Sequence, residues 1–147
     1  MQRVLILGRG GAGKSTLARA LSLRTGLPAV ELDKHFWQPV LLPLSPESWA
    51  KLQEELAALP AWVLDGDLGP YDLLTLRLAR ADTVLVLDYS FPVCAWRAAR
   101  RSPEAKDFWL WVWDYRHRHL PSVLSAVAEH APAATLYRLR SPRATRA

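Results

Sequence analysis

The sequence predicts an α/β fold in which helices cover both faces of a parallel β-sheet. Three observations support this prediction: five short apolar stretches alternate with helical patterns, a glycine-rich loop follows the first stretch, and half of the 147 residues are hydrophobic. The segments between the stretches are long enough for crossover helices, which parallel strands require. The candidate strands span residues 3–7, 29–32, 61–64, 83–87 and 134–139.

The glycine-rich loop reads GRGGAGKS over residues 8–15. It matches the pattern Gly-x-x-x-x-Gly-Lys-Ser, in which glycines let several backbone N–H groups converge on a phosphate. Lys14 is expected to reach the β- and γ-phosphates and the Ser15 hydroxyl to bind Mg²⁺, while the N-terminus of the next helix faces the anion. A glycine-rich turn that matches by chance is the alternative, and the flanking strand and helix patterns disfavour it. The predicted nucleotide-binding residues are Gly8, Gly10, Gly11, Ala12, Gly13, Lys14, Ser15 and Thr16.

Helical patterns follow several of the strands. After the loop, the apolar stripe runs through Leu17, Ala20, Leu21 and the aliphatic part of Arg24, and Gly26 marks a C-terminal stop. The second helix has Ser45 as N-cap, Pro46 in its first turn and an end before Pro60, and a third runs over residues 92–101.

A tryptophan-rich segment at residues 108–113 is compatible with a strand or a helix, and its continuation to His119 favours a helix that Pro121 kinks or restarts. We expect its tryptophans to pack in the core, with an aromatic platform for a base as the alternative.

Length and composition predict one compact domain. Cys94 is the single cysteine, which excludes an internal disulfide and predicts a buried, inert thiol. Neither a signal-peptide pattern nor a membrane-length apolar stretch occurs, so we expect a cytoplasmic protein without membrane contact. The last residues, 141–147, look like a helix start, and we expect the natural chain to continue.

The net charge of +5 is unevenly distributed, because residues 96–147 carry 10 Lys and Arg against 4 Asp and Glu. We therefore expect this basic region to be the part of the chain that binds anions. Nucleic acid would suit such a surface, but the phosphate loop favours an enzyme that transfers a phosphoryl group.

Three aspartates follow candidate strands, and the carboxyl ends of parallel strands border the ligand crevice. We expect Asp65 to bind Mg²⁺ through water and Asp33 to orient or deprotonate an acceptor hydroxyl or to meet Mg²⁺. A turn or helix cap is the alternative for both, and Asp88 is expected to have a structural role.

Arginines form the next candidate group. Arg97 and Arg101 lie four residues apart on the predicted helix, so both can point at a transferring phosphoryl group, and a solvated basic helix face is the alternative. Arg116, Arg118 and His119 repeat the pattern on the next helix. Between these basic stretches we expect a short lid, over residues 98–108.

With these residues in place, the chain resembles the adenylate-kinase-related P-loop small-molecule kinases. More narrowly, it resembles the bacterial DNA topology modulation proteins over nearly its whole length. The loop at residues 8–16 carries the wider resemblance. The segments that match the narrower family are residues 32–39, 62–66, 77–83 and 108–113, together with Trp49, Trp96 and Arg97.

The resemblance implies a P-loop three-layer α/β/α sandwich with strand order 2-3-1-4-5, an ATP site at the loop and a lid hinged near Arg97. It also implies an adenine position at Ser141 and Arg143. The acceptor pocket that it implies is bounded by Asp33, Lys34, Trp37, Asp65 and Arg77.

Two features depart from the resemblance. Asp67 and the residues after it replace the arginine with which adenylate kinases hold the acceptor phosphate, so AMP is not indicated as the acceptor. The lid is also short, which implies incomplete exclusion of water or a second subunit, as in a homodimer, over the site.

Together these observations predict an ATP- and Mg²⁺-dependent phosphotransferase that acts on a small molecule, with nucleotides and nucleosides among the candidates. The first alternative is an ATPase or nucleotide-dependent switch without an acceptor. The second is a nucleic-acid-binding protein that uses the basic C-terminal region. A GTPase is not indicated, because the sequence lacks the Asn-Lys-x-Asp guanine motif.

Overall fold

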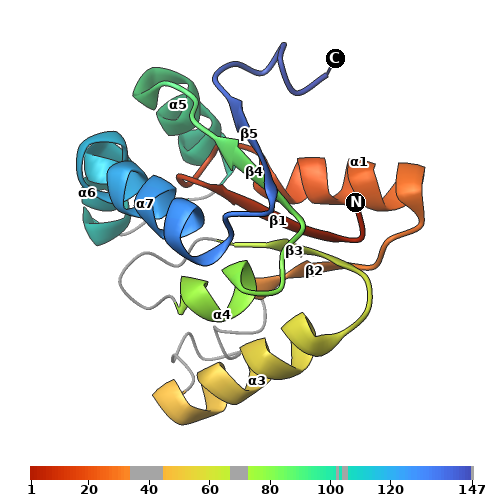
Figure 1. Cartoon of the computed structure of the whole chain (residues 1–147). Helices are drawn as coiled ribbons and strands as arrows, with labels where there is room; N and C mark the ends of the chain where they lie inside the picture. The colour runs from red at the N-terminus through yellow and green to blue at the C-terminus, as the bar shows by residue number, and fades with distance from the viewer. Residues whose placement is uncertain (34–44, 67–72, 102, 104–105, 147) are drawn as a thin grey trace.

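A five-stranded parallel sheet in the order β2-β3-β1-β4-β5 forms the centre of the molecule, as predicted (Figure 1). The computed structural model describes residues 1–33, 45–66, 73–101, 103 and 106–146. All four strand pairs are parallel. The strands are β1 (Arg3–Gly8), β2 (Ala29–Glu31), β3 (Trp62–Asp65), β4 (Thr83–Leu87) and β5 (Thr135–Leu139).

Helices cover both faces of this sheet, which makes the fold a three-layer α/β/α sandwich (Figure 1). Alternate residues of β1 face opposite sides. Ile6 belongs to a buried cluster with Ala18 and Cys94, whereas Leu5 belongs to a second cluster with Leu78 and Val123. The helices are α1 (Lys14–Thr25), α3 (Pro46–Ala58), α4 (Leu74–Leu78), α5 (Phe91–Arg101), α6 (Lys106–Asp114), the π-helix η2 (Tyr115–His119) and α7 (Leu120–His130).

The first helix ends as its sequence predicts, but its buried face differs. Gly26 adopts the left-handed conformation at φ 76°, and its N–H donates to the carbonyl of Ser22. Lys14 and Ala18 are the buried residues of α1, whereas Ala20 and Arg24 are exposed. The predicted stripe was therefore wrong at these two positions. The side of α1 that is buried is the one that carries Lys14 and Ala18.

Helix α3 begins with the predicted cap. Ser45 Oγ accepts a hydrogen bond of 3.3 Å from the N–H of Ser48, and Pro46 occupies the first turn. A cap of this kind satisfies one of the N–H groups that a helix leaves without an internal partner.

The tryptophan-rich segment is helical, and a new α-helix begins beside Pro121. The turn before it is wide, because the Leu120 N–H donates to the carbonyl of Tyr115, five residues earlier. Proline has no N–H and its ring crowds the preceding turn, which explains a π-helix at this position. Tyr115 is fully buried, but Trp113 is 61% exposed, so the expectation that all the tryptophans pack in the core was wrong for Trp113.

The predicted lid is mostly helical where the structure describes it, and the helix start predicted at the C-terminus needs correction. Residues 98–101 of the lid belong to α5 and residues 106–108 to α6, while residues 102, 104 and 105 lie outside the described part of the chain. Beyond β5, residues 141–146 form turns instead of the expected helix start. Within the described ranges, every helix is too short or too polar to cross a bilayer.

Candidate active site

The phosphate loop joins β1 to α1, and two glycines show why its sequence is restricted. Gly11 has φ 78°, and a Cβ built on it would overlap the carbonyl oxygen of Cys94 in α5. Gly13 has φ 91° and precedes the first residue of α1. Left-handed backbone of this kind strains residues that carry a side chain. The loop can therefore fold tightly and remain packed against α5.

The Lys14 side chain lies inside the loop. Its Nζ donates to the carbonyl oxygens of Gly8 at 2.9 Å and Arg9 at 3.2 Å, and the residue is only 9% exposed. An ammonium group therefore stands at the first half of the loop, where the sequence places the terminal phosphates.

Asp65 lies beside this lysine at the end of β3. In the sheet it is paired with Ile6 of the central strand, and only 3% of its surface is exposed. Burial raises the pKa of the Asp65 carboxyl above its ordinary value, while the Lys14 ammonium and a hydrogen bond with the Ser15 side chain act in the opposite direction. The structure thus brings Lys14, Ser15 and Asp65 together as predicted.

The side chains of Ser15 and Asp65 fit a Mg²⁺ ion, because the ion prefers oxygen ligands and needs few of them from the protein. In the described ranges, no group of three or more His, Cys, Asp or Glu residues is arranged to hold a metal. A Mg²⁺ ion at this position would therefore take most of its ligands from phosphate oxygens and water.

Three of the five predicted acceptor-side residues meet around Gly66, which follows Asp65. A Cβ built on Gly66 would lie 3.6 Å from Asp33 Oδ1, and Asp33 itself is exposed. Arg77 of α4 is fully buried and donates from Nη1 to the Gly66 carbonyl at 2.8 Å. A carboxylate and a guanidinium therefore both lie close to the backbone of Gly66.

The rest of this pocket is not described. Lys34, Trp37 and Asp67 all fall outside the described residues, so their expected roles stay predictions.

The two arginines predicted on α5 have different positions. Arg97 Nη1 donates to the Ala12 carbonyl at 3.4 Å, and its guanidinium carbon lies 5.7 Å from the centre of the Tyr89 ring. Arg97 thus covers the second half of the loop. Arg101 is exposed at the last residue of α5, and its part in a two-arginine clamp stays a prediction.

The C-terminal turn approaches the same place. The hydroxyls of Tyr89 and Thr145 share a hydrogen bond, and Thr145 also contacts the carbonyl of Ser141 at 3.4 Å. Tyr89 therefore connects Arg97 with the turn that carries Ser141 and Arg143, the two residues expected near the adenine.

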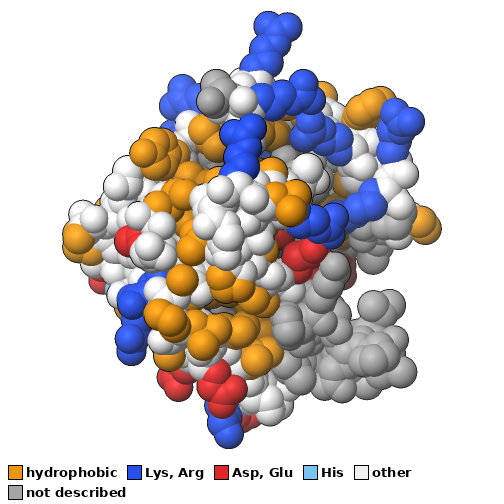
Figure 2. Space-filling model, turned by 90° about the vertical axis from the view of Figure 1, so that its right-hand side faces the viewer, with side chains coloured by type: hydrophobic (Ala, Val, Ile, Leu, Met, Phe, Trp, Pro, Cys, Tyr) orange, Lys and Arg blue, Asp and Glu red, His pale blue; other side chains and the backbone are white. Residues whose placement is uncertain are grey.

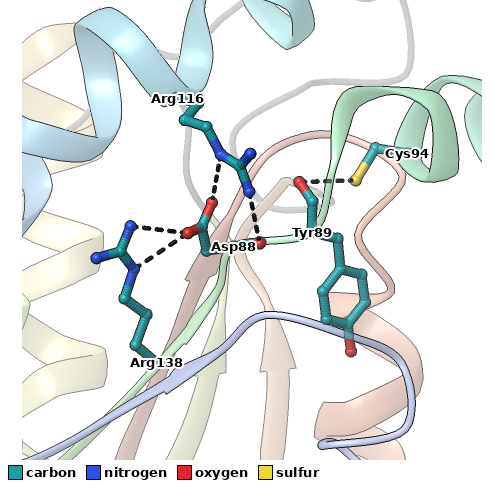
Figure 3. A network of polar contacts seen from close by, with 5 residues as sticks. All are labelled: Asp88, Tyr89, Cys94, Arg116 and Arg138. Carbon is teal, nitrogen blue, oxygen red and sulfur yellow. Dashed lines mark hydrogen bonds and ion pairs between the residues drawn. The ribbon is translucent and has the colours of Figure 1, made fainter.

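A network around Asp88 was not foreseen beyond a structural role for that residue (Figure 3). Asp88 is 2% exposed and accepts from Arg116 Nε at 3.1 Å and from Arg138 Nη2 at 2.8 Å. Leu87, the preceding residue, pairs with Gly8 of the loop. Two arginines are thus fixed beside the phosphate loop by one buried carboxylate. They lie 28 and 50 positions from Asp88, so no local sequence pattern could reveal the pairing.

Arg9 is a second residue whose environment the sequence did not indicate. It is 1% exposed, and its guanidinium carbon lies 5.8 Å from the ring centre of Tyr115. Within the described part of the chain, its Nε and Nη1 have no hydrogen-bond partner. Burial lowers the pKa of the Arg9 guanidinium and raises the pKa of the nearby Cys94 thiol. The buried setting expected for Cys94 is therefore confirmed.

Comparison with known proteins gives a fold but no family. No family model and no curated protein matches the sequence. Among solved structures, the shikimate kinase from Acinetobacter baumannii in complex with shikimate is similar, with a TM-score of 0.69, 16% identity, and coverage of 99% of this chain and 88% of that chain.

Two other kinases share the fold. A gluconokinase from Sinorhizobium meliloti 1021 has a TM-score of 0.56 and 20% identity, with coverage of 98% of this chain and 89% of that chain. A deoxyadenosine kinase from M. mycoides with bound dCTP has a TM-score of 0.53 and 13% identity, with coverage of 97% and 93%. At these identities the similarity establishes the fold alone: the chain has the α/β P-loop fold that these small-molecule kinases share.

Proposed function

We propose that the chain is an ATP- and Mg²⁺-dependent phosphotransferase that acts on a small molecule with a hydroxyl group. The observation that carries this proposal is the junction of two sites at one edge of the sheet. The buried Asp65 is hydrogen-bonded to the Ser15 side chain and lies within the electrostatic influence of Lys14 in the phosphate loop. The next residue, Gly66, lies close to Asp33 and accepts a hydrogen bond from Arg77. A donor and an acceptor bound at these two places would be neighbours.

The donor side has the charges that a triphosphate needs. Loop amides and Lys14 would bind the phosphates, Arg97 would lie over the second half of the loop, and the base would lie near Ser141 and Arg143. Mg²⁺ bound at Ser15 and Asp65 would neutralise charge on the phosphate oxygens. Arg101 is proposed to assist at the transferring group.

On the acceptor side, Asp33 would hold the acceptor hydroxyl and take its proton. The acceptor oxygen forms a bond to the γ-phosphorus, the bond from that phosphorus to the bridging oxygen breaks, and ADP leaves with that oxygen. Lys34, Trp37, Arg77 and Asp65 are the proposed walls of this pocket.

Similar structures support the chemical class of the acceptor. They include a shikimate kinase, a gluconokinase and a deoxyadenosine kinase. We propose nucleosides and nucleotides as the first acceptors to test, and membership of the DNA topology modulation proteins as the narrower family. A cytoplasmic location and a homodimer belong to the same proposal.

The test is product analysis with ATP labelled at the γ-phosphate, against a panel of nucleosides, nucleotides, sugars and hydroxy acids. We expect label in a phosphorylated acceptor with the wild type and none with Lys14→Ala. Label that appears only as inorganic phosphate across the whole panel would support an ATPase or a nucleotide-dependent switch.

A basic surface favours a second candidate, nucleic-acid binding. Figure 2 shows Lys and Arg side chains gathered in the upper part of one face. Two arginines of the basic region 96–147 are already paired within the protein, because Arg116 and Arg138 both bind Asp88. Salt-sensitive binding of duplex DNA that Lys14→Ala leaves unchanged would support this candidate.

A further inference from the structure

Helix α6 and the π-helix cover the first half of the phosphate loop. A Cβ built on Gly10 would lie 2.5 Å from Cζ and 2.6 Å from Cε2 of Phe108, and 3.2 Å from Cγ2 of Val112. The next helical segment places the Tyr115 ring over Arg9. The ring of Phe108 therefore lies directly against the loop backbone, in space that a side chain at position 10 would need.

Two neighbours show which end of the loop the Phe108 ring covers. Lys14 Nζ binds the carbonyls of Gly8 and Arg9, and this lysine is the group that reaches the terminal phosphates. Arg97 marks the opposite end, because it contacts Ala12. Since Gly10 follows Arg9, Phe108 lies at the end of the loop where the γ-phosphate is expected.

An aromatic cluster holds the ring in this place. The Phe108 ring centre lies 5.6 Å from that of Trp109 in an edge-to-face arrangement and 6.1 Å from that of Trp111. Trp111 in turn contacts the buried Tyr115 edge to face at 5.7 Å. Such contacts add to the stability gained from burial, so the ring is fixed to the rest of the helix.

The ring is apolar and offers no donor to a phosphate. Its contribution at the γ-phosphate end is the exclusion of water, which in other kinases is a task of the lid. In the sequence only residues 102–105 separate α5 from α6, and the first turn of α6 places Phe108 against the loop at Gly10.

We propose that Phe108 keeps water away from the γ-phosphate of bound ATP and thereby favours transfer to an acceptor over hydrolysis. This inference rests on the proposed function. In hydrolysis, a water oxygen forms the bond to the γ-phosphorus, the bond to the bridging oxygen breaks, ADP leaves, and the proton of water ends on the released phosphate or in solvent. Phe108 acts here as a positioning residue, since it excludes the competing nucleophile and exchanges no proton.

The test measures phosphate release from MgATP without acceptor, together with ATP affinity. We expect Phe108→Ala to raise acceptor-independent hydrolysis about tenfold, with ATP affinity close to that of the wild type. A merely structural role would lower hydrolysis and affinity together. Phe108→Leu keeps an apolar cover and is expected to behave like the wild type.

Leu110→Ala is the matched control, because Leu110 lies on the same helix and is 53% exposed. It should leave hydrolysis unchanged. If Phe108→Ala does not fold, as judged by circular dichroism, Phe108→Val provides the comparison with Phe108→Leu, and hydrolysis should be faster with the smaller side chain.

The outcomes separate the two proposals. A wild type that does not bind ATP overturns the proposed function and this inference with it. Normal ATP binding, with hydrolysis by the smaller variants at or below the wild-type rate, overturns the role of Phe108 alone.

Discussion

A single buried carboxylate, Asp65, carries the metal side of the proposed site. Asp65 is 3% exposed, and desolvation raises its pKa although Lys14 and Ser15 both favour its charged form. The folded protein therefore opposes the ionisation that Mg²⁺ binding needs, and the ion with its ligands would offset this penalty.

This raised pKa makes stability depend on pH. Below the ordinary pKa of 3.8, Asp65 is protonated in the folded and the unfolded chain. As the pH rises above that value, the carboxyl of the unfolded chain ionises first, so the free energy of unfolding decreases. The decrease ends once the pH has passed the raised pKa of Asp65 in the folded state. We expect the wild type to lose stability relative to Asp65→Asn across this window, measured by urea unfolding of both proteins without Mg²⁺. A difference between the two that does not change with pH would contradict this expectation.

Two glycines with nearly the same φ distinguish the cost of backbone strain from the cost of steric crowding. Gly11 has φ 78° and faces the Cys94 carbonyl, whereas Gly26 has φ 76° and, among the residues that the structure describes, no atom within 4 Å of a built Cβ. Gly26→Ala should cost about 1 kcal/mol of unfolding free energy, the penalty of a left-handed backbone. Gly11→Ala should cost about 3 kcal/mol or more, because the loop or α5 must move. Equal losses in urea unfolding would show that α5 does not restrict the loop.

At the scale of elements, Asp88 connects three segments: the end of β4, the π-helix η2 and strand β5. The two arginine side chains that it binds are 44% and 35% exposed, so each ion pair is partly screened by water. The carboxylate itself is buried, and its hydrogen bonds matter more than the charges alone.

We therefore expect Asp88→Asn to lower the free energy of unfolding by about 2 kcal/mol. The control is Asp114→Asn, because Asp114 pairs with the 77% exposed Arg118 at 3.7 Å. This change should cost less than about 0.5 kcal/mol. Chemical denaturation checks both, and a loss for Asp88→Asn as small as that of the control would remove the proposed connection.

Local patterns predicted the elements well, and contacts between distant residues explain what they missed. The strands, the Ser45 cap and the Gly26 stop follow from short-range preferences, and all are present. The π-helix depends on Pro121 together with the packing of Tyr115, and no periodicity signals it. The buried side of α1 was predicted wrongly. The prediction followed the apolar residues of the helix, whereas the buried side includes Lys14, a charged residue.

In the candidate site, too, local patterns predicted some residues, and contacts between distant residues explain the others. The motif located Lys14 and Ser15, and the rule on strand ends placed Asp65 beside them. The covering of Gly10 by Phe108 depends on how α6 lies on the sheet, so only the structure shows it.

At the scale of the whole molecule, the proposed chemistry depends on one edge of the sheet. The loop after β1, the ends of β2 and β3, and the residue after β4 all lie along it. Helices α5 and α6 pack against the loop at Gly11 and Gly10, so segments from most of the chain form the donor site. A nucleotide bound there should stabilise the whole domain, by about 2.7 kcal/mol at a ligand concentration of 100 times Kd.

Stabilisation of this size is measurable as a rise in Tm with MgATP. We expect the rise for the wild type and for Leu110→Ala, whose change lies outside the site. Lys14→Ala should show little or none, because the ammonium that faces the phosphates is gone. A rise of equal size in Lys14→Ala would place the nucleotide elsewhere on the protein.

The central claim is that the loop between β1 and α1 binds the phosphates of ATP. Calorimetric titration of MgATP into the wild type and Lys14→Ala tests it most directly. We predict one binding site in the wild type and an affinity at least about tenfold lower in the variant, or a loss of about 1.4 kcal/mol. No binding to the wild type, or equal affinity in both proteins, would contradict the claim.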